Sequence, residues 1–167
     1  AIVALAIGGV TAGSVLAVQS SPTHYVAIGD SVAAGQGATV EGQFGYVGLF
    51  NRFYRVDHRG SERLADLAVP GETSSSLAGD QLSRAVEVIN NEDTNVEVVT
   101  VTIGGNDFLP LIRTEPCATN PAGSACQQVV ADTLGEFAGN YQGILPVLST
   151  ALASDPGDER VLVTTYY

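Results

Sequence analysis

Short apolar runs alternate with amphipathic segments through most of the chain, and this alternation constrains its fold more than any other sequence feature. The apolar runs, predicted to be buried strands, are Tyr25–Gly29, Leu64–Val69, Val96–Ile103 and Arg160–Tyr166. Parallel strands need long crossover connections, which helices supply, so alternating strands and helices predict a parallel sheet covered by helices. We therefore expect an α/β domain with three layers, α/β/α.

Three segments between these runs have the apolar spacing of helices. In residues 46–56, one helical face is expected to hold Val47, Phe50, Phe53 and Tyr54. Residues 77–93 repeat apolar side chains at spacings of three and four. The same spacing continues from Val130 to Leu152, where Pro146 is expected to interrupt or kink a long helix.

The charge of the chain excludes several classes of function. It carries 7 Lys+Arg against 18 Asp+Glu, for a formal net charge of −11. Because an acidic surface repels phosphate backbones, we expect no nucleic-acid partner. All seven basic residues are arginine, which excludes a Walker A loop, a Schiff-base lysine and a serine–lysine pair. Four arginines form a basic strip that fits either a phospholipid headgroup or a solvated helix-and-turn face. They are Arg52, Arg55, Arg59 and Arg63.

Residues 1–18 form an uncharged and mostly apolar run. Such a run is typical of the core of a secretory signal, with residues 15–17 as a tolerable cleavage site. A membrane anchor is the second interpretation, since 18 helical residues span roughly 27 Å, and a buried core helix is the third. We expect residues 1–23 to be a signal or anchor segment with a spacer, which would contact a membrane if uncleaved. Residues 24–167 are then the domain of a secreted or membrane-anchored protein. The missing methionine and basic leader predict a clipped N-terminus.

The two cysteines, Cys117 and Cys126, flank a loop rich in Pro, Gly and Asn. In an exported protein this arrangement predicts a disulfide, and the alternative is a pair of free thiols. A structural zinc needs four ligands, and the two histidines, His24 and His58, lie far from the cysteines in sequence. We therefore expect no metal.

The loop after the first strand holds Ser31 on a Gly-Asp-Ser turn. A dinucleotide-binding motif fails because Val40 stands at the third glycine, and a nucleophile elbow fails at Ala33. What remains is a hydroxyl near a helix N-terminus with backbone N–H groups beside it. Taken alone, Ser31 is either an exposed reactive serine or a helix cap.

The loops after the second and third strands offer hydrogen-bond donors at the same edge of the sheet. Gly71 can present its N–H to a developing negative charge, or it can simply form a Pro-Gly turn. Asn106 carries an uncharged amide donor, and the alternative is a helix cap formed by Asn106 or Asp107. Asp30 is interpreted as a turn residue. In parallel sheets the chemistry gathers beyond the carboxyl ends of the strands.

The runs YVAIGDS, LAVPGETSSS and TIGGND, in this order, resemble the SGNH (GDSL-type) hydrolases, and the resemblance covers residues 24–167. It implies a flavodoxin-like three-layer fold and ester hydrolysis through an acyl-serine, without a cofactor. It implies that Ser31 is the nucleophile and that its own N–H, the Gly71 N–H and the Asn106 amide form an oxyanion hole. Disulfides are found in exported esterases of this family, so the resemblance is consistent with a Cys117–Cys126 disulfide.

The family takes its catalytic histidine from an Asp-x-x-His motif near the C-terminus, and this sequence has none. His24 and His58 precede the first two strands, and five strand residues put roughly 16 Å between the two ends of a strand. Neither histidine therefore reaches Ser31. We expect a chain cut before that motif, with the C-terminal part of the fold missing and little activity of its own.

Two further interpretations remain open at this point. One is a non-catalytic descendant that binds an ester or a carbohydrate in the same cleft, and the other is a structural domain whose loops are turns and caps. For an enzyme we expect a small ester or lipid substrate and a monomer. The loop over residues 39–45 and the cysteine loop are expected to border the acyl pocket.

Overall fold

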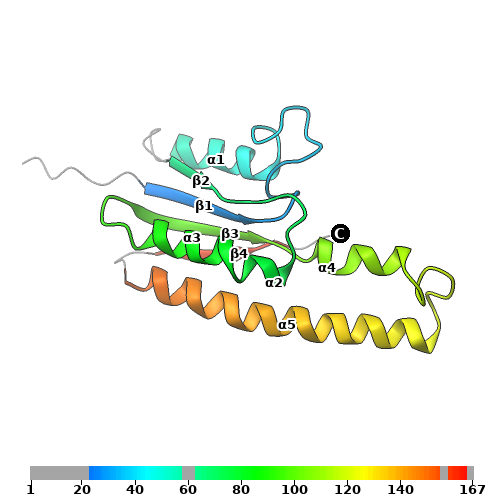
Figure 1. Cartoon of the computed structure of the whole chain (residues 1–167). Coiled ribbons are helices and arrows are strands. Elements are labelled where there is room, and N and C mark those ends of the chain that lie inside the picture. The colour runs from blue at the N-terminus through cyan, green and yellow to red at the C-terminus, as the bar shows by residue number, and fades with distance from the viewer. Residues whose placement is uncertain (1–22, 58–62, 155–157, 165–167) are drawn as a thin grey trace, which may run out of the picture.

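Four parallel strands form the central sheet of the computed structural model, which describes residues 23–57, 63–154 and 158–164 (Figure 1). The strands are β1 (Thr23–Gly29), β2 (Arg63–Asp66), β3 (Asn95–Thr102) and β4 (Arg160–Val163). Their order in the sheet is β2-β1-β3-β4, and all three neighbouring pairs are parallel. The predicted parallel sheet is confirmed, with the β-branched run of β3 at its centre.

Helices cover both faces of this sheet. They are α1 (Tyr46–Asp57), α2 (Ser74–Leu77), α3 (Asp80–Ile89), α4 (Gly105–Phe108), the 3-10 helix η1 (Leu109–Arg113) and α5 (Ser124–Leu152). Helix α1 lies on one face, while α2, α3 and α5 lie on the other (Figure 1). The described residues therefore form the predicted α/β/α arrangement.

The two faces of β3 are chemically different. Val99, Val101 and Ile103 are buried in the apolar core beneath α3 and α5. On the α1 face, the Thr100 hydroxyl bonds the hydroxyl of Tyr25 at 2.8 Å, and Thr102 bonds the Tyr46 hydroxyl. The α1 layer is therefore attached partly through the Tyr46–Thr102 hydroxyl pair, whereas the α3–α5 layer is attached mainly through apolar packing.

Several element ends differ from the sequence prediction. The helix predicted over residues 77–93 is α3, which starts after Gly79 and ends at Ile89, and the short helix α2 precedes it. Helix α5 begins six residues before Val130 and runs through Pro146 without interruption. Proline removes only one N–H donor from the helix. Ile144 and Leu148, on either side of Pro146, are buried, and their packing keeps the helix continuous there.

The second and fourth strands are shorter than predicted. Strand β2 ends at Asp66 rather than Val69, although the N–H groups of Leu67 and Val69 still donate to carbonyls of β1. Strand β4 ends at Val163, and the predicted strand residues beyond Thr164 lie outside the described residues.

Phe53 was predicted on the buried face of α1, and this prediction is wrong. Val47 is buried, and Phe50 and Tyr54 pack beside it, but Phe53 is 74% exposed. At 100° per residue, Phe53 lies about 120° around the helix from Val47, so it cannot share the same contact surface. The amphipathic stripe of α1 is narrower than its run of apolar residues.

The predicted disulfide is confirmed. Cys117 and Cys126 are bonded, both are buried, and their Cα atoms are 4.7 Å apart. The bond closes the loop between η1 and the first turn of α5. It ties the start of the longest helix to the segment that follows β3.

Reducing this disulfide is expected to lower the free energy of unfolding by about 2–3 kcal/mol. The sequence separation is 9, and releasing so short a loop gives the unfolded chain a moderate gain in entropy. Thermal unfolding with and without a reducing agent measures the effect. A variant with both cysteines replaced by serine is the control, because its midpoint should not respond to the reductant. An unchanged midpoint for the parent chain would contradict the prediction.

The predicted signal or anchor segment, residues 1–18, lies outside the described residues. Within the described part of the chain, no helix is both long enough and apolar enough to span a membrane.

Candidate functional site

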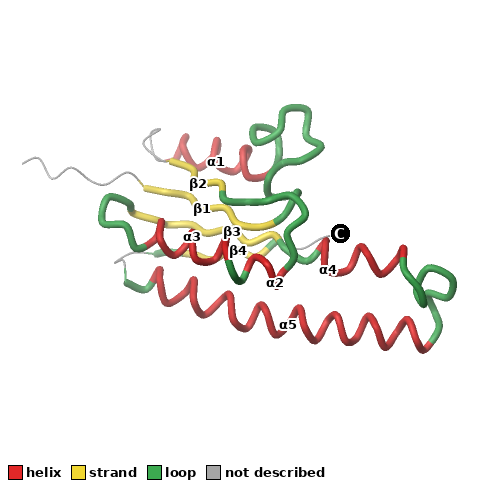
Figure 2. Tube along the Cα trace, viewed as in Figure 1, coloured by secondary structure: helices red, strands yellow, loops and turns green. Residues whose placement is uncertain are grey.

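The carboxyl ends of β1, β3 and β4 meet at a cavity of about 690 Å³. Figure 2 shows the loops that leave this edge of the sheet and the start of α4 beside them. The cavity is lined mainly by apolar side chains, with Ser31 and Asn106 among the polar ones. The lining residues are Asp30, Ser31, Val32, Ile103, Gly104, Gly105, Asn106, Phe108, Leu109, Phe137, Tyr141, Val163 and Thr164.

The Gly-Asp-Ser turn is fixed by the neighbouring strand. The Asp30 N–H donates to the Thr102 carbonyl at 3.0 Å. The Asp30 carboxylate, which is buried, accepts the Val32 N–H at 2.9 Å, so its interpretation as a turn residue is confirmed. Ser31 is half-buried and faces the cavity. Its backbone is therefore anchored on both sides while its side chain stays accessible.

Gln81, on α3, bonds the strand end that precedes this turn, although no local sequence pattern points to it. Its side chain is fully buried. The Gly29 N–H donates to Gln81 Oε1 at 2.8 Å, and Gln81 Nε2 donates to the Gly29 carbonyl at 2.9 Å. One amide side chain thus satisfies both polar groups of the last residue of β1, two positions before Ser31.

Replacing Gln81 with leucine is expected to lower the free energy of unfolding by about 1–3 kcal/mol, because the buried Gly29 N–H loses its partner, whereas the Gly29 carbonyl still accepts the Val69 N–H. Urea unfolding measures the loss. The control is Gln142→Leu on the exposed side of α5, which should change stability by no more than about 0.5 kcal/mol. Similar losses for both variants would show that the Gln81 bonds contribute nothing specific.

Asn106 connects the loops that follow β2 and β3. Its Nδ2 donates to the Glu72 carbonyl at 2.8 Å. An asparagine amide has two N–H groups, so this bond leaves one for another acceptor. Gly104, rather than Asn106 or Asp107, occupies the N-cap position of α4. Asn106 therefore does not act as the helix cap that was its alternative interpretation.

Asp107 lies on α4, but its carboxylate accepts hydrogen bonds from the first residue of α2. Its carboxylate accepts the Ser74 N–H at 3.0 Å and the Ser74 hydroxyl at 2.6 Å. Ser74 is buried and also accepts a bond from Asn140 Nδ2 at 2.9 Å. This polar cluster joins α2, α4 and α5 below the cavity, so Asp107 caps the first turn of α2.

Gly71 forms the expected turn but does not line the cavity. It has φ +89, and the Glu72 N–H bonds the Val69 carbonyl at 3.2 Å, as in a Pro-Gly turn. The residue is exposed, and no atom lies within 4 Å of the position a Cβ would take. The structure thus brings Ser31 and Asn106 to one cavity, and ties the Gly71 loop to it through the Glu72–Asn106 bond.

Aromatic side chains form one wall of the cavity. The ring of Phe137 lies 5.6 Å from that of Phe108 and 4.7 Å from that of Tyr141, measured between centroids. Gly104 makes room for this wall, since a Cβ there would lie 2.8 Å from the Phe137 ring. Burial, assisted by the charges of Asp107 and Asp30, raises the pKa of Tyr141 to about 12. Its hydroxyl is therefore a neutral donor at physiological pH.

Neither loop that was expected to border the pocket contributes to this lining. The loop over residues 39–45 and the cysteine loop are both absent from the residues around the cavity. The reason is that α5 passes beneath the end of β3, so its middle turns supply the wall instead. That part of the prediction is wrong.

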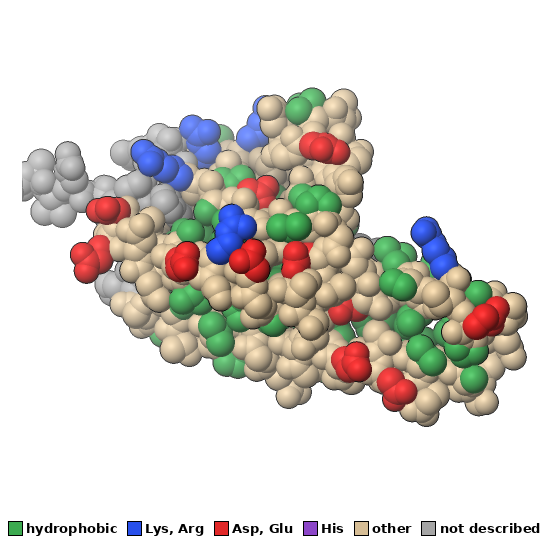
Figure 3. Space-filling view, in the orientation of Figure 1, with side chains coloured by type: hydrophobic (Ala, Val, Ile, Leu, Met, Phe, Trp, Pro, Cys, Tyr) green, Lys and Arg blue, Asp and Glu red, His purple; other side chains and the backbone are tan. Residues whose placement is uncertain are grey.

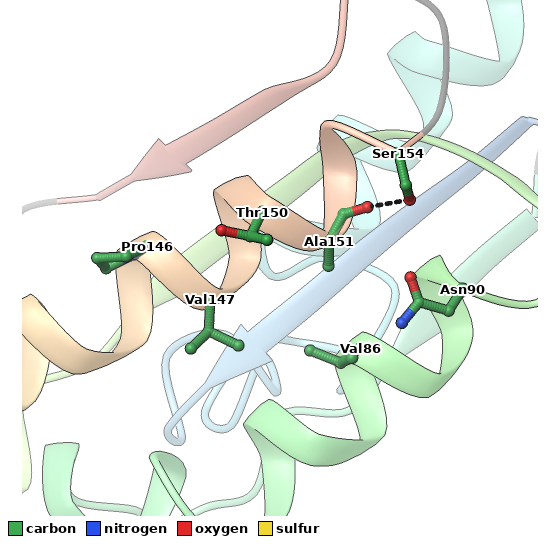
Figure 4. A pocket seen from close by; sticks show the side chains of 7 residues that line it. All are labelled: Val86, Asn90, Pro146, Val147, Thr150, Ala151 and Ser154. Atoms are coloured by element: carbon green, nitrogen blue, oxygen red, sulfur yellow. Dashed lines mark hydrogen bonds between the residues drawn. The ribbon is translucent and has the colours of Figure 1, made fainter.

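A second cavity, of about 470 Å³, lies between α3 and α5 (Figure 4). Val86 and Val147 face each other across it, and Ser154 donates to the Ala151 carbonyl at 2.6 Å. The described residues that line it include no titratable side chain. It lies near the C-terminal end of α3, at the opposite edge of the sheet from Ser31, so it takes no part in the Ser31 site.

His24 does not join the site. His24 lies in β1 at the amino end of the strand, whereas Ser31 follows its carboxyl end. His58 lies outside the described residues. Among the residues that the structure describes, no three His, Cys, Asp or Glu side chains are grouped as metal ligands.

Comparison with known proteins gives a consistent result. A family model described as GDSL-like lipase/acylhydrolase matches residues 25–165. The lipase Lip_vut3, from a goat rumen metagenome, is 21% identical with a TM-score of 0.66, over 86% of this chain and 64% of that lipase. A point mutant of the esterase AlinE4 is 22% identical with a TM-score of 0.52, over 86% of this chain and 59% of that esterase. No curated protein sequence matches the chain.

These solved structures share the fold of the chain, which spans less than two thirds of their length.

Proposed function

The chain belongs to the GDSL-like lipase/acylhydrolase family, whose model spans residues 25–165, and from this premise we propose that it forms most of an exported serine esterase. The observation that carries the proposal is the cavity shared by Ser31 and Asn106 at the carboxyl edge of the sheet. A reactive hydroxyl and an uncharged amide donor at one apolar cavity fit acyl transfer.

In the proposed reaction, Ser31 Oγ attacks the ester carbonyl carbon and loses its proton to a general base. The carbonyl oxygen becomes an oxyanion that accepts the Ser31 N–H, the Gly71 N–H and the second N–H of Asn106. When the tetrahedral adduct collapses, the bond to the alcohol breaks and the alcohol leaves with the proton. Water then releases the acid from the acyl-serine by the same steps. Each oxyanion donor supplies roughly 3 kcal/mol in such reactions.

The anchoring of the turn supports this assignment. Gln81 and Asp30 fix the backbone on either side of the strand end, so the Ser31 N–H keeps one orientation. The Glu72–Asn106 bond fixes the amide and holds the Gly71 loop next to it. Donors held before the reaction need no reorganisation as charge develops.

The described residues place no histidine beside Ser31 as a general base. The chain has two histidines, of which His24 lies at the wrong end of β1 and His58 precedes β2. A serine hydroxyl without a base is a poor nucleophile at neutral pH. We therefore expect residues 1–167 alone to turn over esters slowly, if at all.

The test compares residues 1–167 with the product of the complete source gene, using a short-chain 4-nitrophenyl ester. We expect turnover by the complete product, little by the shorter chain, and covalent labelling of Ser31 in the complete product by a fluorophosphonate. Labelling at another residue, or no turnover by the complete product, would refute the esterase. Ester binding without turnover would then favour a ligand-binding domain.

Export is part of the same proposal. The Cys117–Cys126 disulfide supports it, since such bonds persist in oxidising compartments. Mass analysis of the secreted protein tests it, and the expected mature chain begins after residues 15–17. Retention of the protein in the cytoplasm would contradict export.

A further inference from the structure

The outer face of α1 carries an apolar stripe that the core does not use. Leu49, Phe53 and Val56 are 39%, 74% and 77% exposed. Their spacing of four and three places them on one side of the helix. Phe44, from the preceding loop, is 46% exposed, and its ring contacts Arg52 of α1. Isolated exposed apolar residues are ordinary, but a contiguous group of them marks an interaction surface.

Arginines border this stripe. Arg52 lies over the Phe44 ring, with its guanidinium carbon 5.5 Å from the ring centroid. Arg55 is exposed about 60° further around the helix, on the flank away from Phe53. No acidic residue occurs between Glu41 and Asp57. We call Phe44, Leu49, Arg52, Phe53, Arg55 and Val56 the α1 patch.

The α1 patch is a basic area on an acidic protein. Arg52 and Arg55 lie on α1, where no acidic residue precedes Asp57, although the chain has a net charge of −11. Figure 3 shows arginine side chains gathered over α1, while most of the acidic side chains on this face lie over the rest of the domain. Because charges are screened beyond about 10 Å at 0.1 M salt, an approaching surface meets the local arginines rather than the net charge.

We propose that the α1 patch docks on an anionic lipid surface, with Phe53 and Val56 entering the headgroup boundary and Arg52 and Arg55 contacting phosphate groups. Apolar residues beside arginines are the composition of helices that lie in a membrane interface. A second copy of this chain does not fit the α1 patch, because a two-fold contact would bring the same arginines face to face. The patch also has far fewer side chains than the 20–30 residues of a stable protein interface.

The test uses vesicles of phosphatidylcholine containing 30% phosphatidylglycerol, with pure phosphatidylcholine vesicles for comparison. The chain has no tryptophan, so Phe53→Trp reports on its own position alone. We expect a blue shift of its emission with anionic vesicles and no shift with neutral ones. The matched control is Ile112→Trp, because Ile112 is 66% exposed on η1 beside an arginine and should show no shift.

Binding of the vesicles by sedimentation gives the second readout. Phe53→Ser with Val56→Ser should weaken binding by tenfold or more, from the lost apolar burial. Arg52→Gln with Arg55→Gln should weaken it about 25-fold on anionic vesicles, at about fivefold for each arginine. The control Ile112→Ser should bind like the parent. Circular dichroism confirms that each variant is folded.

Other outcomes would overturn the proposal. Equal shifts at both tryptophan positions, or equal losses with Ile112→Ser, would mean non-specific adhesion. No shift at position 53 would exclude docking through this face. Residues 1–18 are present in every variant, so any vesicle binding by that segment would be the same in all of them and would not produce the difference between positions 53 and 112. A change in oligomeric mass with unchanged vesicle binding would make the patch a self-association surface. No ester is used, so the result is independent of the proposed esterase activity.

Discussion

Replacing Ser31 with alanine in the complete gene product is expected to reduce kcat for a short-chain 4-nitrophenyl ester by a factor on the order of 10⁴ or more. The variant has no hydroxyl to form the acyl-serine, while the Gly71 N–H and the Asn106 amide remain. Residual catalysis therefore comes from the oxyanion donors alone. Initial rates at saturating ester, corrected for spontaneous hydrolysis, measure the loss.

Ser75→Ala is the matched control, because Ser75 is an exposed serine on α2. It should retain the parent rate. The two variants should also unfold at the same urea concentration, which separates a chemical effect from a folding defect. A Ser31→Ala enzyme within tenfold of the parent would mean that another group is the nucleophile.

The second large effect is expected for Gly29→Ala, which should lower the free energy of unfolding by more than about 4 kcal/mol. Gly29 has φ +147, and a Cβ there would lie 2.1 Å from the Thr102 carbonyl oxygen. The obstacle is backbone of the neighbouring strand, so no side chain can rotate to relieve it. The ends of β1 and β3 would have to separate.

Gly37→Ala isolates the contribution of backbone conformation. Gly37 also has a positive φ, +84, but nothing lies within 4 Å of its Cβ position. Its replacement should cost only about 1–2 kcal/mol, the penalty for placing an L side chain in the left-handed region. Urea unfolding compares the two variants. Equal losses would show that the contact with Thr102 is relieved at little cost.

The sheet was predictable because its strands are local patterns. The β-branched run before Gly104 and the apolar run before Gly29 each identify a strand from neighbouring residues alone. The order of the motifs also predicted that Ser31 and Asn106 would meet, since parallel strands present their carboxyl ends at one edge. The cavity they share agrees with that expectation.

The contacts that complete the site were not predictable in this way. Gln81 bonds Gly29 across 52 positions, and nothing beside Gln81 in the sequence distinguishes it from other polar helix residues. Asn106 reaches Glu72 across 34 positions. Phe53 was misplaced because periodicity shows which residues share a helix face, but not how wide a face the sheet covers.

The two helical layers should differ in how they tolerate substitution. Beneath α3 and α5, methyl and methylene groups fill space without a preferred direction, so exchanges among Val, Ile and Leu keep most of the contact. Beneath α1, the Thr102 hydroxyl meets those of Tyr46 and Thr164, and each bond requires a particular atom at a particular place. Redesign of the α1 layer would have to change these partners together, whereas the apolar positions of the α3–α5 layer, unlike Gln81, can be altered one residue at a time.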